Sequence, residues 1–283
     1  MSTLRFLVLV TVAVLLPLLP KVQFYWFNFL FHYLHLPFSW LDTFLHEISH
    51  GLVAVLTGGE IIKIHLRLNG GGECHYAGGW QILVNFAGYA GASLWGAALY
   101  VGASSTATVS NRLAIGVLLL VLISAWSKLV ALFALLGLSG VVGYSVALAV
   151  GIALYLLAVS FVVRSSHPLA TSILVFILLS GVLWVGDAES WLVLGAISLM
   201  IFVPLWFVQN RYIQLFVQFI GLYVLVNSTR SALALLSIAR SGDDTRMANI
   251  TALPESFWVS VWALLSVVLL LLLLRRSLRT AAS

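Results

Sequence analysis

Long apolar runs separated by short polar segments make up most of this chain. A helix that crosses a bilayer needs about 20 mostly apolar residues, and many of the runs approach that length. They predict about eight or nine transmembrane helices, at Leu4–Leu19, Leu41–Thr57, Trp80–Gly102, Leu113–Leu138, Val141–Val163, Leu169–Val185, Trp191–Val208, Tyr212–Leu235 and Phe257–Leu274. The expected fold is an all-α polytopic membrane protein in which residues 1–283 form a single transmembrane domain.

An aromatic-rich segment, Phe24–Trp40, lies between the first two predicted spans. Aromatic side chains favour the headgroup level of a bilayer, where one end of the ring meets water and the rest meets lipid. The composition therefore predicts a helix that lies along the membrane interface.

Two polar segments interrupt the series of spans. In residues 58–79, apolar and polar positions alternate along Glu60–Leu68 with the period of two that is typical of a strand, and the glycine-rich turn Asn69–Gly72 follows. This pattern predicts a small Gly-rich β-hairpin directly after the helix 41–57. Residues 237–256 carry several charged side chains and predict an extramembrane loop with one short helix.

Composition supports a membrane environment and excludes a soluble domain. Apolar residues make up 62% of the chain and charged residues 8%, whereas a soluble domain has roughly half and a quarter. Although the net charge is +5, the basic residues stand singly between apolar runs, as in multi-pass membrane proteins. The expected partners are therefore membrane lipids and not nucleic acid. Cys74 is the single cysteine, so no internal disulfide forms.

The chemistry of the chain is concentrated in His46-Glu47-Ile-Ser-His50, inside the second predicted span. Four residues separate the two histidines, so both imidazoles leave one face of a helix and can bind one metal ion. Glu47 follows the first ligand and is placed to act as the general base of a hydrolase. Ionisable residues inside a spanning helix are costly and mark functional sites. His46 and His50 are thus the candidate metal ligands, and Glu47 is the candidate catalytic residue.

The chain resembles the site-2-protease-like intramembrane zinc metallopeptidases, in particular their small bacterial branch that lacks a PDZ domain. The resemblance rests on five segments: His46–Gly51, Thr57–Gly59, Ala77–Gly79, the small-residue helix Asn85–Gly96 and the late loop Gly242–Pro254. It implies a Zn²⁺-dependent metalloendopeptidase of the bacterial inner (plasma) membrane. It also implies a substrate that is a membrane protein or peptide, cleaved in or near a transmembrane segment.

One position departs from the pattern of that family. The resemblance implies an Asp as third zinc ligand near the end of the helix Tyr212–Leu235, where this chain has Arg230. Zinc sites with hydrolytic activity need three protein ligands. The remaining candidates for the third ligand are Asp243, Asp244 and the hairpin residues His65, His75, Glu60 and Glu73. Asp42, one turn before His46, is expected to orient an imidazole.

Two alternative functions stay open on these residues. If Arg230 marks a degenerate site, the chain is a catalytically inactive protease-fold membrane protein with a binding or regulatory role. If the intramembrane His and Glu residues relay ions, it is a transporter. Lys128, inside an apolar run, either lines a polar cavity or extends to the membrane surface beside a helix break. Gly88, Gly91 and Gly96 are expected to let helices approach closely.

Overall fold

The computed structural model describes residues 3–21, 25–105, 107–165, 167–237 and 242–282. Within these ranges the chain forms ten α-helices, two short 3₁₀ helices and one antiparallel two-stranded sheet. The elements are α1 (Thr3–Leu15), a 3₁₀ helix (Leu16–Lys21), α2 (Tyr25–Leu56), β1 (Glu60–Leu66), β2 (Gly72–Ala77), α3 (Gln81–Ser104), α4 (Ala107–Leu135), α5 (Gly140–Arg164), α6 (Pro168–Trp184), α7 (Ala188–Phe207), α8 (Asn210–Ala234), a 3₁₀ helix (Leu235–Ser237), α9 (Asp243–Thr251) and α10 (Glu255–Ala282).

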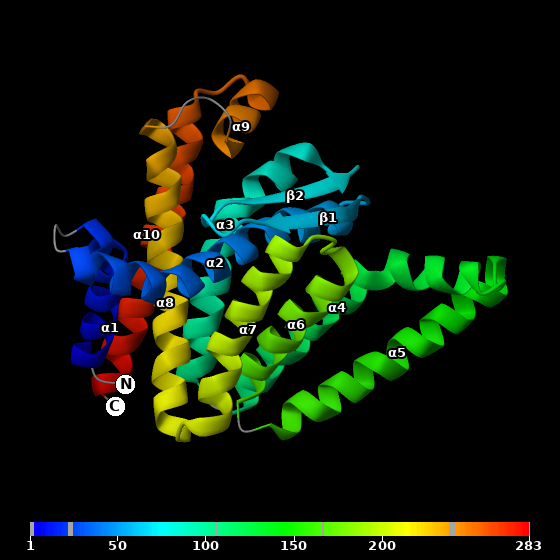
Figure 1. Ribbon diagram of the computed structural model, residues 1–283, viewed down its shortest axis with the longest axis horizontal. Helices are drawn as coiled ribbons and strands as arrows, with labels where there is room; N and C mark the ends of the chain where they lie inside the picture. The colour runs from blue at the N-terminus through cyan, green and yellow to red at the C-terminus, as the bar shows by residue number, and fades with distance from the viewer. Residues whose placement is uncertain (1–2, 22–24, 106, 166, 238–241, 283) are drawn as a thin grey trace.

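The helices form an extended bundle with the hairpin at one end (Figure 1). Helices α1, α3, α8 and α10 pack together on one side, α4, α6 and α7 continue the bundle, and α5 lies at the far edge against α4 and α6. Helix α2 crosses this arrangement, and both strands of the hairpin contact it. The short helix α9 packs on α3 and α10 on the same side as the hairpin. All of the polar elements therefore gather around α2.

Length and hydropathy support six membrane-spanning helices among the described residues: α3, α4, α5, α7, α8 and α10. Two shorter apolar helices, α1 and α6, accompany them. The predicted hairpin and the short helix in the polar segment 237–256 are confirmed as β1–β2 and α9. The chain is thus an integral membrane protein of mainly helical fold, and the total of eight or nine spans stays a prediction.

Helix α2 differs from the sequence prediction. Residues Tyr25–Leu56 form one continuous helix that runs through Pro37 and includes most of the aromatic segment and of the predicted span Leu41–Thr57, while Phe24 lies outside the described residues. A proline removes one backbone hydrogen bond and kinks a helix, but packing on both sides can hold the helix together. Leu41, Phe44 and Ile48 are fully buried just after Pro37, so the core fixes α2 where the local signal favours a boundary.

Small residues allow the closest helix contact in the bundle, as predicted for the glycines of α3. A Cβ at Gly96 would lie 2.6 Å from the Gly221 carbonyl oxygen of α8, and a Cβ at Gly221 would lie 2.6 Å from the Gly96 carbonyl oxygen. A Cβ at Gly91 would instead meet the Ser49 side chain of α2. Backbone therefore packs directly on backbone, which is how membrane helices gain contact without a hydrophobic driving force.

The hairpin is anchored through β1. The Leu66 N–H donates to Ser190 Oγ at 2.8 Å, and the Leu68 N–H donates to the carboxylate of Glu189 at 2.7 Å. His65 Nδ1 lies 2.9 Å from Asp187 Oδ2. Burial alone would raise the pKa of Asp187, but the hydrogen bonds from His65 and Ser190 hold that pKa well below its usual range. The start of α7 thus covers the outer edge of β1, whereas on β2 the Cys74 N–H donates to Glu47 of α2.

The α3–α8 contact predicts a stability difference between two glycines. Gly221→Ala should lower the apparent melting temperature of the purified protein in detergent, because overpacking of this kind costs about 1–3 kcal/mol. Gly195→Ala in α7 is the matched control, since nothing lies within 4 Å of an added Cβ there. It should leave the melting temperature unchanged or raise it slightly. Equal melting temperatures for the two variants would contradict this account of the packing.

Candidate metal centre

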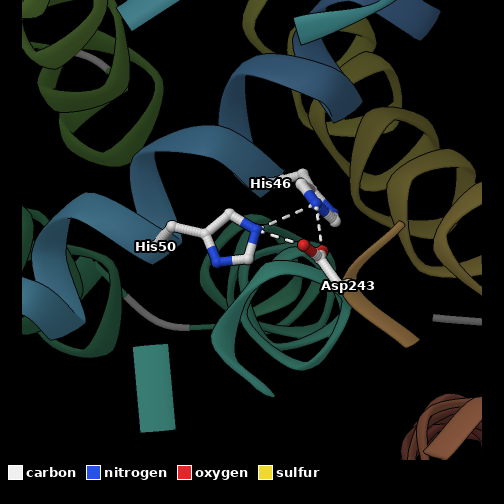
Figure 2. A group of neighbouring side chains, drawn as sticks. All are labelled: His46, His50 and Asp243. Carbon is white, nitrogen blue, oxygen red and sulfur yellow. Dashed lines mark hydrogen bonds and ion pairs between the residues drawn. The ribbon is translucent and has the colours of Figure 1, made fainter. Parts of the chain in front are cut away.

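Three side chains from two distant parts of the chain converge on one point (Figure 2). His46 Nε2 and His50 Nε2 are 3.1 Å apart, and Asp243 Oδ2 lies 3.0 Å from the first and 3.1 Å from the second. The two histidines project from one face of α2, as their spacing predicts, while Asp243 is the first residue of α9. These three residues are the one group of metal-ligand type found among the described residues.

The geometry of this group fits a tetrahedral zinc ion. Zinc bonds of 2.0–2.1 Å separate neighbouring ligand atoms by about 3.3 Å, so the observed spacing needs an expansion of only a few tenths of an ångström. His50 Nδ1 lies 2.6 Å from the Val84 carbonyl oxygen and must donate its proton there. Nε2 of a neutral His50 therefore keeps its lone pair for a metal, with the ring orientation fixed by the backbone of α3.

Gly88 of α3 leaves the space in which the three ligand atoms meet. A Cβ at this position would lie 2.5 Å from both His46 Cε1 and His50 Nε2. Any side chain would therefore collide with the two imidazoles. The neighbouring Tyr89 packs its ring edge-on against His46, with the ring centroids 4.5 Å apart. Helix α3 thus shapes the metal centre from the side opposite α2.

Glu47 lies between α2 and the hairpin. Its side chain is buried, and its carboxylate accepts a hydrogen bond from the Cys74 N–H of β2. A Cβ at Gly72 would lie 2.8 Å from Glu47 Cγ, so β2 can approach the helix only with glycine there. The carboxylate is near enough to interact electrostatically with His46, His50 and Asp243. This is the placement that a general base beside a metal requires.

Asp243 carries the negative charge of the centre. Burial alone would raise the pKa of Asp243, but the charge of His50 and the hydrogen bonds to both histidines hold that pKa well below its usual range. The side chain is therefore ionised at neutral pH, which is the form that binds metal. Its second oxygen faces Arg246, whose guanidinium nitrogen lies 4.0 Å from Asp243 Oδ1.

Contacts of α9 with the bundle set the position of Asp243. Met247 is fully buried in a cluster that includes Trp262. Thr245 Oγ1 donates to Glu255 Oε1 at 3.0 Å, and Trp258 Nε1 donates to Thr251 Oγ1 at 3.1 Å. Both ends of the short helix are thus tied to α10. The sequence offers Asp243 as a candidate ligand, but no local pattern in it predicts these contacts.

The other proposed third ligands lie outside the metal group. Asp244 is buried on a different side of α9, and desolvation raises its pKa. His65 bonds Asp187, and His75 pairs with Glu73 on the exposed face of the hairpin. Glu60 is exposed at the start of β1. Burial and the charge of Glu47 raise the pKa of the Cys74 thiol, so it stays protonated and is a poor metal ligand.

Two expectations for neighbouring residues are corrected. Asp42 does not orient an imidazole, because its Oδ2 instead accepts a hydrogen bond from Asn227 Nδ2 of α8 at 2.6 Å. Arg230 does not stand in the metal group either, since its guanidinium donates to the Pro17 carbonyl oxygen at 3.3 Å. The acid that was expected near Arg230 is supplied by the segment that follows, at Asp243.

Comparison with known proteins agrees with this site. The family described as Peptidase M50B-like matches residues 6–163 and 138–273, which together cover nearly the whole chain. The chain belongs to the Peptidase M50B-like family. Its resemblance to the site-2 proteases is thereby confirmed. Searches of curated proteins and of solved structures gave no match. Membership in the M50B-like family indicates a metallopeptidase, and the group His46, His50 and Asp243 is where this chain can hold the metal.

The metal centre predicts different outcomes for two adjacent acids. Purified protein should contain about one zinc per chain, and Asp243→Asn should lose most of it, because even the loss of a residue that only supports a ligand costs about 10–100-fold in metal affinity. Asp244→Asn is the matched control and should retain zinc. Elemental analysis after dialysis against a weak chelator measures both variants. Retention of zinc by Asp243→Asn, or loss from Asp244→Asn alone, would rule out this ligand set.

Proposed function

We propose that this protein is an intramembrane zinc metalloprotease that hydrolyses peptide bonds in or near transmembrane segments of substrate proteins. The observation that carries the proposal is the convergence of His46, His50 and Asp243 beside the buried carboxylate of Glu47. Family membership and the helical membrane fold support the same reaction class. We further propose that the protein resides in a bacterial inner membrane.

Each residue of the site has its own role in peptide hydrolysis. Zinc bound by His46, His50 and Asp243 would polarise the scissile carbonyl and make water a stronger nucleophile. A Glu47 carboxylate oxygen accepts the proton of the attacking water and then transfers it to the leaving amine. The Cys74 N–H orients that carboxylate. The water oxygen adds to the carbonyl carbon of the peptide, and the C–N bond then breaks. No other reactant is needed.

The outer edge of β2 is the place that we propose for the substrate. A transmembrane helix protects its peptide bonds by its own hydrogen bonds, so it must unwind locally before hydrolysis. Backbone groups of alternate residues in a strand face the same edge. The Cys74 N–H points from that edge to Glu47. A peptide that adds to β2 as a third strand would therefore run beside the general base.

The alternative function, a catalytically degenerate protein, depended on Arg230, which stands where the resemblance implies an Asp ligand. The structure gives that residue a partner in the Pro17 carbonyl oxygen, and Asp243 completes a set of three ligands. An intact set of two histidines, one aspartate and one adjacent glutamate favours an enzyme over a degenerate site.

The general base is tested by Glu47→Gln, which keeps the size of the side chain and removes its basicity. Cleavage of a model membrane substrate should fall by at least about 100-fold, whereas zinc content should stay close to that of the wild type. Glu73→Gln, on the exposed face of the same hairpin, is the control and should cleave normally. A Glu47→Gln protein that cleaves as fast as the wild type removes the protease proposal.

The role of the hairpin is tested by replacing residues 60–77 with a short Gly-Ser linker. Because the metal ligands come from α2 and α9, the variant should keep its zinc. It should nevertheless lose cleavage, because the edge that holds the unwound peptide is gone. Gel-based cleavage assays and zinc analysis on the same preparation check both points. Full activity in the linker variant would refute strand addition.

A further inference from the structure

Lys128 is a cation within an apolar helix that the proteolytic site does not use. It lies in α4, about two turns before the helix ends at Leu135. Helix α4 continues without a break from Ala107 through Lys128 to its end, so no helix break releases the side chain. Among the described residues, the ion pairs of Lys and Arg join Lys63 to Asp187, Arg67 to Glu73 and Arg246 to Asp243. Lys128 takes part in none of them.

The Lys128 side chain lines a cavity between α4, α5 and α6. The cavity has a volume of about 250 Å³. Apart from Lys128 and Tyr155, its walls are apolar and include Leu122, Leu129 and Ala158. A single positive charge at the wall of an otherwise apolar space matches a molecule that has an apolar chain and an anionic group. In a membrane, that combination is typical of an acidic lipid.

We propose that the α4–α5–α6 cavity with Lys128 is a binding site for an anionic phospholipid. One acyl chain occupies the apolar cavity, and the phosphate pairs with the Lys128 ammonium. Lys128 stands about 10 Å from the end of α4, given 1.5 Å per residue. A lysine can keep its four-carbon stem along apolar surface while its ammonium group meets a polar partner. The lipid thereby satisfies an intramembrane charge that has no acidic partner among the described residues.

The test compares two lipids that differ only in the headgroup. Full-length, delipidated protein in detergent is titrated with dioleoyl-phosphatidylglycerol or dioleoyl-phosphatidylcholine, and bound lipid is counted by native mass spectrometry. The anionic lipid should bind the wild type about five-fold more tightly, the effect of one lysine near a phosphate. Lys128→Leu should abolish this preference, and Lys128→Arg should retain it.

Two further variants separate the charge from the cavity. Ala158→Leu fills the cavity and should weaken binding of both lipids while leaving Lys128 in place. Arg112→Leu removes an exposed cation at the other end of α4 and should leave the preference unchanged. Equal affinity of the wild type for the two lipids overturns the proposal. The same preference in Lys128→Leu also overturns it, as does a spectrum in which a second protein chain occupies this face in place of lipid. Neither readout depends on proteolysis.

Discussion

A single carboxylate held between two imidazoles is the interaction on which the arrangement of this protein depends. Asp243 reaches His46 and His50 across almost 200 residues of sequence and joins α9 to α2. Each of these groups alone would be costly to bury in an apolar bundle. Together, the negative charge of Asp243 and the donor capacity of the imidazoles offset that cost. A metal ion in the same place would supply the positive charge that pairs with Asp243.

The packing around the centre follows from the need to bring backbone close to these side chains. Gly88 of α3 and Gly72 of β2 stand at the two positions where a Cβ would collide with the ligands or with Glu47. The carbonyl of Val84 fixes the His50 ring, and the N–H of Cys74 binds the Glu47 carboxylate. Backbone groups thus orient the side chains of the candidate metal centre from both sides of α2. Backbone is a rigid source of hydrogen bonds, so the fold itself holds these side chains in place.

The sequence predicted those parts of the structure that depend on local patterns. Apolar runs located the helices, the period-two alternation located the hairpin, and the spacing of His46 and His50 predicted their shared face. The continuity of α2 through Pro37 was missed because buried contacts after the proline override the local signal. The choice of Asp243 over Asp244 was also beyond reach. Neighbouring residues on a helix face different directions, and only the docking of α9 through Met247 decides which one faces α2.

The origin of the third ligand has a consequence for how the centre forms. Two ligands belong to α2, whose fully buried residues lie in the main core, whereas the third belongs to a nine-residue helix packed in a separate, smaller cluster. A helix of that length has little stability of its own, so its position depends on Met247 and on its hydrogen bonds to α10. A metal ion bound by these three residues would therefore stabilise the docking of α9, and the docking of α9 would in turn strengthen metal binding. Because the ligands come from separate clusters, the candidate metal centre links two parts of the bundle.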